Sequence, residues 1–140
     1  MARLAGELGY PSTREQVAAR LDEILDRTDH AVFVAESDEV GDGGKRVTGW
    51  IHAFVQRTIE SDPTVEICGL VVAEGSRGCG IGRLLMEQAE RWGRGTRCST
   101  MTVRSNIVRE RAHKFYQRLG YSLLKTQRVF RKQVTANHSV

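Results

Sequence analysis

The chain has 140 residues, of which 40% are hydrophobic and 27% are charged. This length suits one domain with a hydrophobic core, and the composition excludes a disordered or fibrous chain. We therefore predict a single domain over residues 1–140. The formal net charge of +4 suits an anionic partner, which could be either a nucleic acid or a phosphate-rich cofactor.

The sequence carries no membrane or metal signature. No apolar stretch approaches the roughly 18 residues that cross a bilayer, and the N-terminus lacks the apolar core of a signal peptide. We therefore expect a cytoplasmic protein without a membrane partner. The three cysteines include no Cys-x-x-Cys pair, so neither a disulfide framework nor a zinc site is indicated. Cys68 is expected to be a small core residue of a strand.

The first predicted elements are helices. Residues 2–8 read as a short helix that ends at Gly9, and Ser12 is a predicted N-cap with Glu15 three residues later. The apolar stripe of this second helix is interpreted as scaffold, and it consists of Val17, Leu21, Ile24 and Leu25.

Three strands are predicted next. Residues 31–36 and 47–59 are β-rich runs on either side of a glycine-containing turn over 38–46, so they should form a hairpin. Residues 61–63 turn the chain into a third strand over 65–73, which completes an antiparallel meander.

A glycine-rich run over residues 77–82 separates the third strand from an amphipathic helix, whose apolar face is predicted to include Leu84, Leu85 and Ala89. Glycines at alternate positions let the backbone approach a ligand closely, and a helix N-terminus presents unpaired N–H groups. The run therefore predicts a diphosphate site. It is not a P-loop, because no Lys-Ser/Thr follows Gly82, and it lacks the Gly-x-Gly-x-x-Gly spacing of a dinucleotide site. A glycine-rich turn without a ligand is the alternative interpretation.

The rest of the chain is predicted to hold a strand over 100–104 and a helix over 107–119 that Gly120 ends. One or two closing strands should follow within 121–134, before a frayed tail over 135–140. The whole pattern predicts an α+β fold, with a mixed, mainly antiparallel central sheet flanked by helices.

The spacing Arg-x-x-Gly-x-Gly over residues 77–82 resembles the acetyl-coenzyme A signature of the GNAT superfamily of N-acetyltransferases. Ile67, Leu70 and Val72 resemble the family's fourth strand, and residues 105–121 resemble its closing strand–helix–strand block. The resemblance covers roughly residues 31–134. It implies a GNAT-like fold in which the fourth and fifth strands splay apart after a bulge, with the acyl-carrier arm in the gap.

The family usually opens with a strand, whereas this chain begins in helix-like sequence, so the first strand is expected to be missing. Either the chain is truncated relative to its relatives, or a partner chain completes the edge, as in a homodimer.

The resemblance also implies the cofactor-binding residues. The backbone of the predicted third strand should pair with the pantetheine arm of the cofactor. The glycine run should hold the pyrophosphate, and an asparagine should hydrogen-bond the pantetheine arm. These residues are Leu70, Val71 and Val72, then Arg77, Gly78, Cys79, Gly80, Ile81, Gly82 and Arg83, and finally Asn106. No metal is implied.

Two residues are predicted to be catalytic. Tyr116 matches the family tyrosine that can protonate the coenzyme A thiolate, and a phenol with a pKa near 10 suits that task. Glu66 lies eleven residues before Arg77, where some members carry a general base. The alternative for Glu66 is a solvated cross-strand partner. His113 is a weaker acid–base candidate, and His52 could face the acceptor cleft.

The resulting prediction is an N-acetyltransferase that moves acetyl from acetyl-coenzyme A directly to a primary amine within a ternary complex. The acceptor could be a small molecule or a protein amine, and its pocket should be built from the first two helices and the strand over 47–59. The first alternative is a non-catalytic acyl-coenzyme A-binding or regulatory domain. Nucleic-acid binding ranks third, because nothing resembles a helix-turn-helix.

Overall fold

The computed structural model describes residues 1, 12–38, 44–105 and 108–135. The chain divides into two compact units, Met1–Arg104 and Ser105–Val140. The helix predicted over 2–8 and the question of a missing first strand lie outside the described residues, as do most of the turn over 38–46 and most of the predicted tail.

The first described helix is α2, Arg14–Leu25, and it begins one residue later than the predicted cap implies. The backbone N–H of Gln16 donates to Thr13 Oγ1 at 3.1 Å, and the backbone N–H of Thr13 donates to Gln16 Oε1 at 2.9 Å. Thr13 rather than Ser12 is therefore the N-cap, because Gln16 completes the capping box with it. The hydroxyl of Ser12 instead accepts a hydrogen bond from Arg20.

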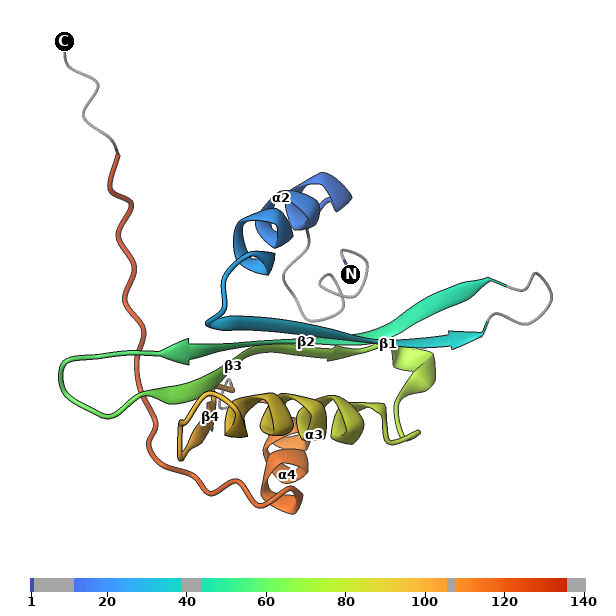
Figure 1. Ribbon diagram of the computed structural model, residues 1–140. Coiled ribbons are helices and arrows are strands. Elements are labelled where there is room, and N and C mark those ends of the chain that lie inside the picture. Colours follow the sequence, from blue (N-terminus) through green and yellow to red (C-terminus); the bar gives the residue numbers. More distant parts are fainter. Residues whose placement is uncertain (2–11, 39–43, 106–107, 136–140) are drawn as a thin grey trace, which may run out of the picture. The chain divides into compact units, whose positions relative to one another are not determined.

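The sheet of the first unit has four strands in the order β1-β2-β3-β4 (Figure 1). They are β1 His30–Asp38, β2 Lys45–Gln56, β3 Thr64–Val72 and β4 Met101–Val103. The first two pairings are antiparallel and β3 pairs with β4 in parallel. The predicted mixed, mainly antiparallel α+β sheet is confirmed.

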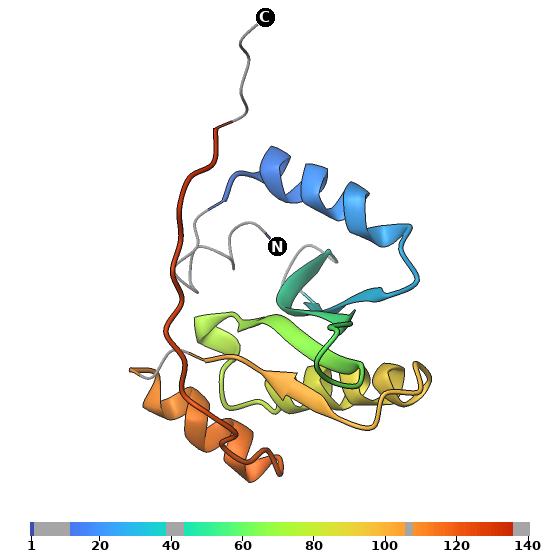
Figure 2. The same ribbon diagram turned by 90° about the vertical axis from the view of Figure 1, so that its left-hand side faces the viewer.

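The core of this unit lies between the sheet and α3, Ile81–Arg94. Alternate residues of β2 and β3 are buried against it, including Ile51, Ala53, Val65 and Ile67, and the helix buries Leu85, Met86 and Ala89. Leu84 was predicted on this face and is instead 65% exposed, because the buried helical stripe passes through its neighbours. Figure 2 shows α2 over the opposite face of the sheet.

A bulge interrupts β3 next to β2. His52 lies opposite Gly69 while Ala53 lies opposite Ile67, so Cys68 is the extra residue. The predicted position of Cys68 in the core is wrong, because the bulge leaves it exposed.

The strands β3 and β4 pair over three residues only, from Val65 to Ile67 on β3. Residues 68–72 of β3 continue beside β2 with no described strand on their other side. The splay after a bulge that the family resemblance implied is therefore present.

The second unit contains helix α4, Glu110–Arg118. Gly120, at φ 94°, ends it as predicted, and the N–H of Tyr121 donates to the Tyr116 carbonyl at 3.0 Å. The closing strands predicted within 121–134 are wrong, because the described backbone there forms no ladder with any described strand. Five large apolar side chains of this segment are at least 80% exposed, namely Leu123, Leu124, Val129, Phe130 and Val134.

Candidate acyl-transfer site

The glycine loop before α3 has an open, left-handed backbone. Gly78 and Gly80 have φ values of 85° and 79°, which residues with a side chain rarely adopt. A Cβ atom added to either glycine would meet nothing within 4 Å. The loop therefore leaves open space beside its backbone, where a side chain would otherwise lie.

The N-terminus of α3 is uncapped by side chains. Gly80 is its N-cap, no side chain hydrogen-bonds to that cap, and the first turn carries no acidic residue. The unpaired N–H groups of the first turn and the positive end of the helix dipole both favour an anion there. The fit to a diphosphate is therefore good, because an acidic cap would have repelled one.

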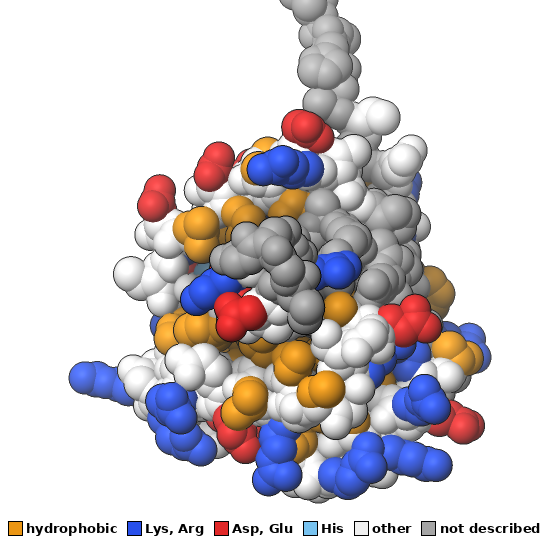
Figure 3. Space-filling view, turned by 90° about the vertical axis from the view of Figure 1, so that its right-hand side faces the viewer, with side chains coloured by type: hydrophobic (Ala, Val, Ile, Leu, Met, Phe, Trp, Pro, Cys, Tyr) orange, Lys and Arg blue, Asp and Glu red, His pale blue; other side chains and the backbone are white. Residues whose placement is uncertain are grey.

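Arginines flank this loop. Arg77 Nε donates to the carbonyl oxygen of Val72 at 3.4 Å, and Arg83 forms an exposed ion pair with Glu87 at 3.1 Å. Figure 3 shows exposed Lys and Arg side chains on the side of the molecule that it draws. The charge next to the loop adds to the attraction of an anion.

The predicted cofactor-binding residues of the first unit lie close together along the chain. Leu70, Val71 and Val72 lie on the splayed part of β3, and the strand runs through a short 3₁₀ helix, Glu74–Ser76, into the glycine loop. An extended ligand could pair with the unpaired edge of β3 and place its anionic end in the loop.

A cavity of about 370 Å³ lies on the α2 side of the sheet. Its lining comes from α2, the first two strands, the bulge of β3 and the segment before α2. These residues are Met1, Ser12, Val17, Arg20, Leu21, Ile24, Val32, Trp50, His52, Cys68 and Gly69. Val17, Leu21 and Ile24 of the helical stripe interpreted as scaffold thus form a cavity wall, in the region where the acceptor pocket is expected.

His52 belongs to a pair of histidines on this face. Its Nε2 atom lies 2.9 Å from Nδ1 of His30, and the two rings stack with centroids 5.2 Å apart. His30 also stacks on Phe54. Burial, and then the neighbouring His30, lower the pKa of His52 below its usual 6.5. His52 is therefore neutral at physiological pH and can accept a proton.

Glu66 lies on the same face but has a different partner. It sits opposite Phe54 in the β2–β3 register, and its carboxylate Oε1 accepts a hydrogen bond from Arg104 Nε. Its side chain is 10% exposed, against 56% for Arg104. The alternative of a solvated cross-strand residue is wrong, since Glu66 is a buried member of an ion pair.

Cys68 lies at the bulge and lines the cavity. Although the residue as a whole is exposed, partial burial of its thiol and then the charge of Glu66 raise its pKa to about 12. The thiol therefore stays protonated at physiological pH, which disfavours Cys68 as a nucleophile.

Tyr116 lies on α4 in the second unit. Its ring makes edge contacts with Phe115 and Tyr121, at centroid distances of 5.3 and 6.2 Å. Burial raises its pKa, and Arg109 opposes this shift without cancelling it. The phenol is therefore protonated at physiological pH, as a general acid requires. Asn106 lies outside the described residues, and His113 lies on α4, three residues before Tyr116.

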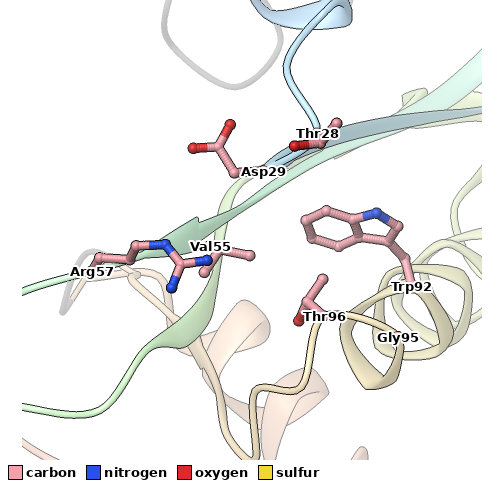
Figure 4. A pocket seen from close by; sticks show the side chains of 7 residues that line it. All are labelled: Thr28, Asp29, Val55, Arg57, Trp92, Gly95 and Thr96. Atoms are coloured by element: carbon pink, nitrogen blue, oxygen red, sulfur yellow. The ribbon is translucent and has the colours of Figure 1, made fainter.

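A second cavity, of about 320 Å³, lies at the C-terminal end of α3 (Figure 4). Its lining includes Asp29, Arg57, Trp92 and Thr96. It includes neither the glycine loop nor the splayed part of β3, so it is separate from the candidate site.

Comparison with known proteins defines the family. The model of the acetyltransferase (GNAT) family matches residues 3–121, so this chain belongs to the GNAT acetyltransferases, which use acetyl-coenzyme A. No curated protein matched the chain. Within the part of the chain that the structure describes, no cluster of three or more His, Cys, Asp or Glu could hold a metal, and no helix has the length and apolarity of a membrane span.

Solved structures share the fold. The aminoglycoside acetyltransferase AAC(6')-Iy, solved with a bisubstrate analogue, is 23% identical with a TM-score of 0.78, over 95% of this chain and 89% of that one. Glucosamine-6-phosphate N-acetyltransferase from Arabidopsis thaliana is 18% identical with a TM-score of 0.75, over 95% and 89%. AAC(6')-IG from Acinetobacter haemolyticus is 16% identical with a TM-score of 0.72, over 89% and 84%.

Proposed function

We propose that this GNAT acetyltransferase transfers the acetyl group of acetyl-coenzyme A directly to a primary amine within a ternary complex. The observation that carries the proposal is the continuity of three features in one unit. The open glycine loop follows the splayed strand β3, and the bulge of that strand lines the cavity on the α2 side.

The cofactor side rests on the backbone. Residues 78–83 would hold the pyrophosphate through N–H groups, with Arg77 adding positive charge, and residues 70–72 would pair with the pantetheine arm. Asn106 stays a proposed partner of that arm. Bound acetyl-coenzyme A supplies the activated acyl group.

The reaction also needs two proton transfers. A carbon–nitrogen bond forms as the carbon–sulfur bond breaks, so the attacking amine must lose one proton and the departing sulfur must gain one. We propose Tyr116 as the donor to sulfur, on the basis of its match to the family tyrosine and its raised pKa.

For the proton of the amine, we propose His52 ahead of Glu66. His52 lines the cavity and is neutral, and His30 is placed to share the proton that it accepts. Glu66 does not line the cavity, and its carboxylate is occupied by Arg104. The alternative, in which Glu66 acts as the base through water, is distinguished from a base at His52 by the variants described below.

The test is a thiol-release assay with acetyl-coenzyme A and a panel of primary amines, with the acetylated product identified by mass spectrometry. The proposal predicts saturable release that depends on the amine and yields an N-acetyl product. Binding of acetyl-coenzyme A without release on any amine would favour the alternative of a non-catalytic binding domain.

A further inference from the structure

The cavity on the α2 side has an unusual balance of charge for a site that takes amines. Among its described lining residues none is Asp or Glu, and the ionisable side chains are Arg20, His52 and Cys68. The thiol of Cys68 is protonated and His52 is neutral, so Arg20 supplies the fixed charge. Apart from this guanidinium, the described lining side chains are thus neutral, and most of them are apolar.

Such a lining disfavours a polycation. An aminoglycoside or a polyamine carries several ammonium groups, and each one that leaves water without a carboxylate partner loses solvation free energy. The guanidinium of Arg20 adds repulsion.

The apolar wall instead fits a hydrocarbon body. Val17, Leu21 and Ile24 project from α2, and Val32 and Trp50 come from the sheet. The volume of about 370 Å³ lies at the lower end of the range for small-molecule sites, so the body must be small.

Arg20 then points to an anionic group. Its Nη1 donates to the hydroxyl of Ser12 at 2.9 Å, and no described carboxylate forms an ion pair with it. A guanidinium has five N–H donors in a planar fork that suits a carboxylate, and one neutral hydroxyl leaves most of them available.

We propose that the acceptor is a small monoamine with an apolar body and one anionic group, which Arg20 binds. A hydrophobic amino acid has this chemistry. The inference rests on the proposed function, since it assigns the substrate class of the same site.

The experiment compares matched acceptors in the thiol-release assay. L-Phenylalanine and L-leucine are paired with phenethylamine and isopentylamine, which lack the carboxylate, and neamine and spermidine represent polycations. The proposal predicts that kcat/KM for each amino acid exceeds that of its decarboxylated partner by roughly tenfold or more, because the lost contact is a charge-assisted one. Neamine and spermidine should be the poorest acceptors.

Variants of α2 assign the effect to Arg20. Arg20→Leu should remove the preference for the carboxylate through a rise in KM for the amino acid, and it should change kcat/KM for phenethylamine less than kcat/KM for phenylalanine. Arg20→Lys should keep part of the preference. Arg14→Leu is the matched control, because Arg14 lies on the same helix but does not line the cavity. Equal preference in the wild type and Arg20→Leu would overturn the proposal.

Equilibrium dialysis of radiolabelled phenylalanine with the coenzyme A-bound protein separates this inference from the proposed activity. Saturable binding that Arg20→Leu weakens, without thiol release, would keep the acceptor class and reject the transfer. Release with neamine or spermidine in preference to the amino acids would keep the transfer and reject the acceptor class. The acceptor class would also be rejected if the anionic amines neither bind nor become acetylated.

Discussion

Nδ1 of His30 and Nε2 of His52 lie 2.9 Å apart on adjacent strands of the sheet. At this distance one imidazole donates to the other, and protonation of both rings would place two like charges in contact. The pair therefore favours a neutral His52, which is the state that a proton acceptor needs.

The first prediction concerns the pH dependence of activity. The neutral form of His52 is the active one, and its pKa lies below 6.5. We therefore expect kcat/KM to keep its full value at neutral pH and to fall as the pH drops through that pKa. His30→Gln removes the neighbour that helps to lower the pKa of His52, so this pKa should rise and the acidic limb of the pH profile should move to higher pH. His52→Gln should lower kcat by roughly 100-fold or more and abolish that limb. An unchanged pH profile in both variants would remove His52 from the mechanism.

The second prediction separates Glu66 from His52. Glu66→Gln breaks the ion pair with Arg104, so the free energy of unfolding should fall, while kcat should stay within about tenfold of the wild type. Urea denaturation and steady-state kinetics on the same variant measure the two effects. A loss of kcat as large as that of His52→Gln, with stability preserved, would instead make Glu66 the base.

The third prediction concerns the contact between β2 and α3. A Cβ atom at Gly49 would lie 3.0 Å from the carbonyl oxygen of Val71, 3.1 Å from Leu85 and 3.2 Å from Ile81. Gly49→Ala should therefore destabilise the protein by about 1–3 kcal/mol. Gly75→Ala is the control, because that position is open and should change stability by less than about 0.5 kcal/mol. Equal unfolding midpoints for the two variants would show that Gly49 is not a close contact.

The fourth prediction concerns the departing sulfur. Tyr116→Phe removes the phenol but keeps the ring contacts with Phe115 and Tyr121, so the fold should be preserved. We expect kcat to fall by roughly 100-fold while the affinity for acetyl-coenzyme A, measured by calorimetry, changes little. A variant with full kcat would exclude Tyr116 as the proton donor.

Much of the site could be predicted where it depends on adjacent residues. The glycine run, the strand before it and the helix after it are contiguous, so their residue types and spacing predicted an open loop between a strand and a helix. The bulge at Cys68 and the contact between His30 and His52 could not be read in this way. Both depend on the register between strands that lie far apart along the chain.

The same reason explains two further differences. Arg104 pairs with Glu66 across 38 residues, so a sequence pattern that offered a general base or a solvated glutamate did not reveal this ion pair. The segment over 121–134 contains strand-favouring residues, but a strand also needs a neighbouring edge to pair with, and residue composition does not supply one.

Calorimetric titration with acetyl-coenzyme A tests the central claim most directly, since the glycine loop carries the functional assignment. We predict one saturable site in the wild type, and the same affinity in Gly75→Ala. Gly80→Glu should abolish binding, because it combines a left-handed φ of 79° with a carboxylate at the anion site, and its thermal unfolding should confirm that it is folded. Undiminished binding by folded Gly80→Glu, or no binding by the wild type, would contradict the account.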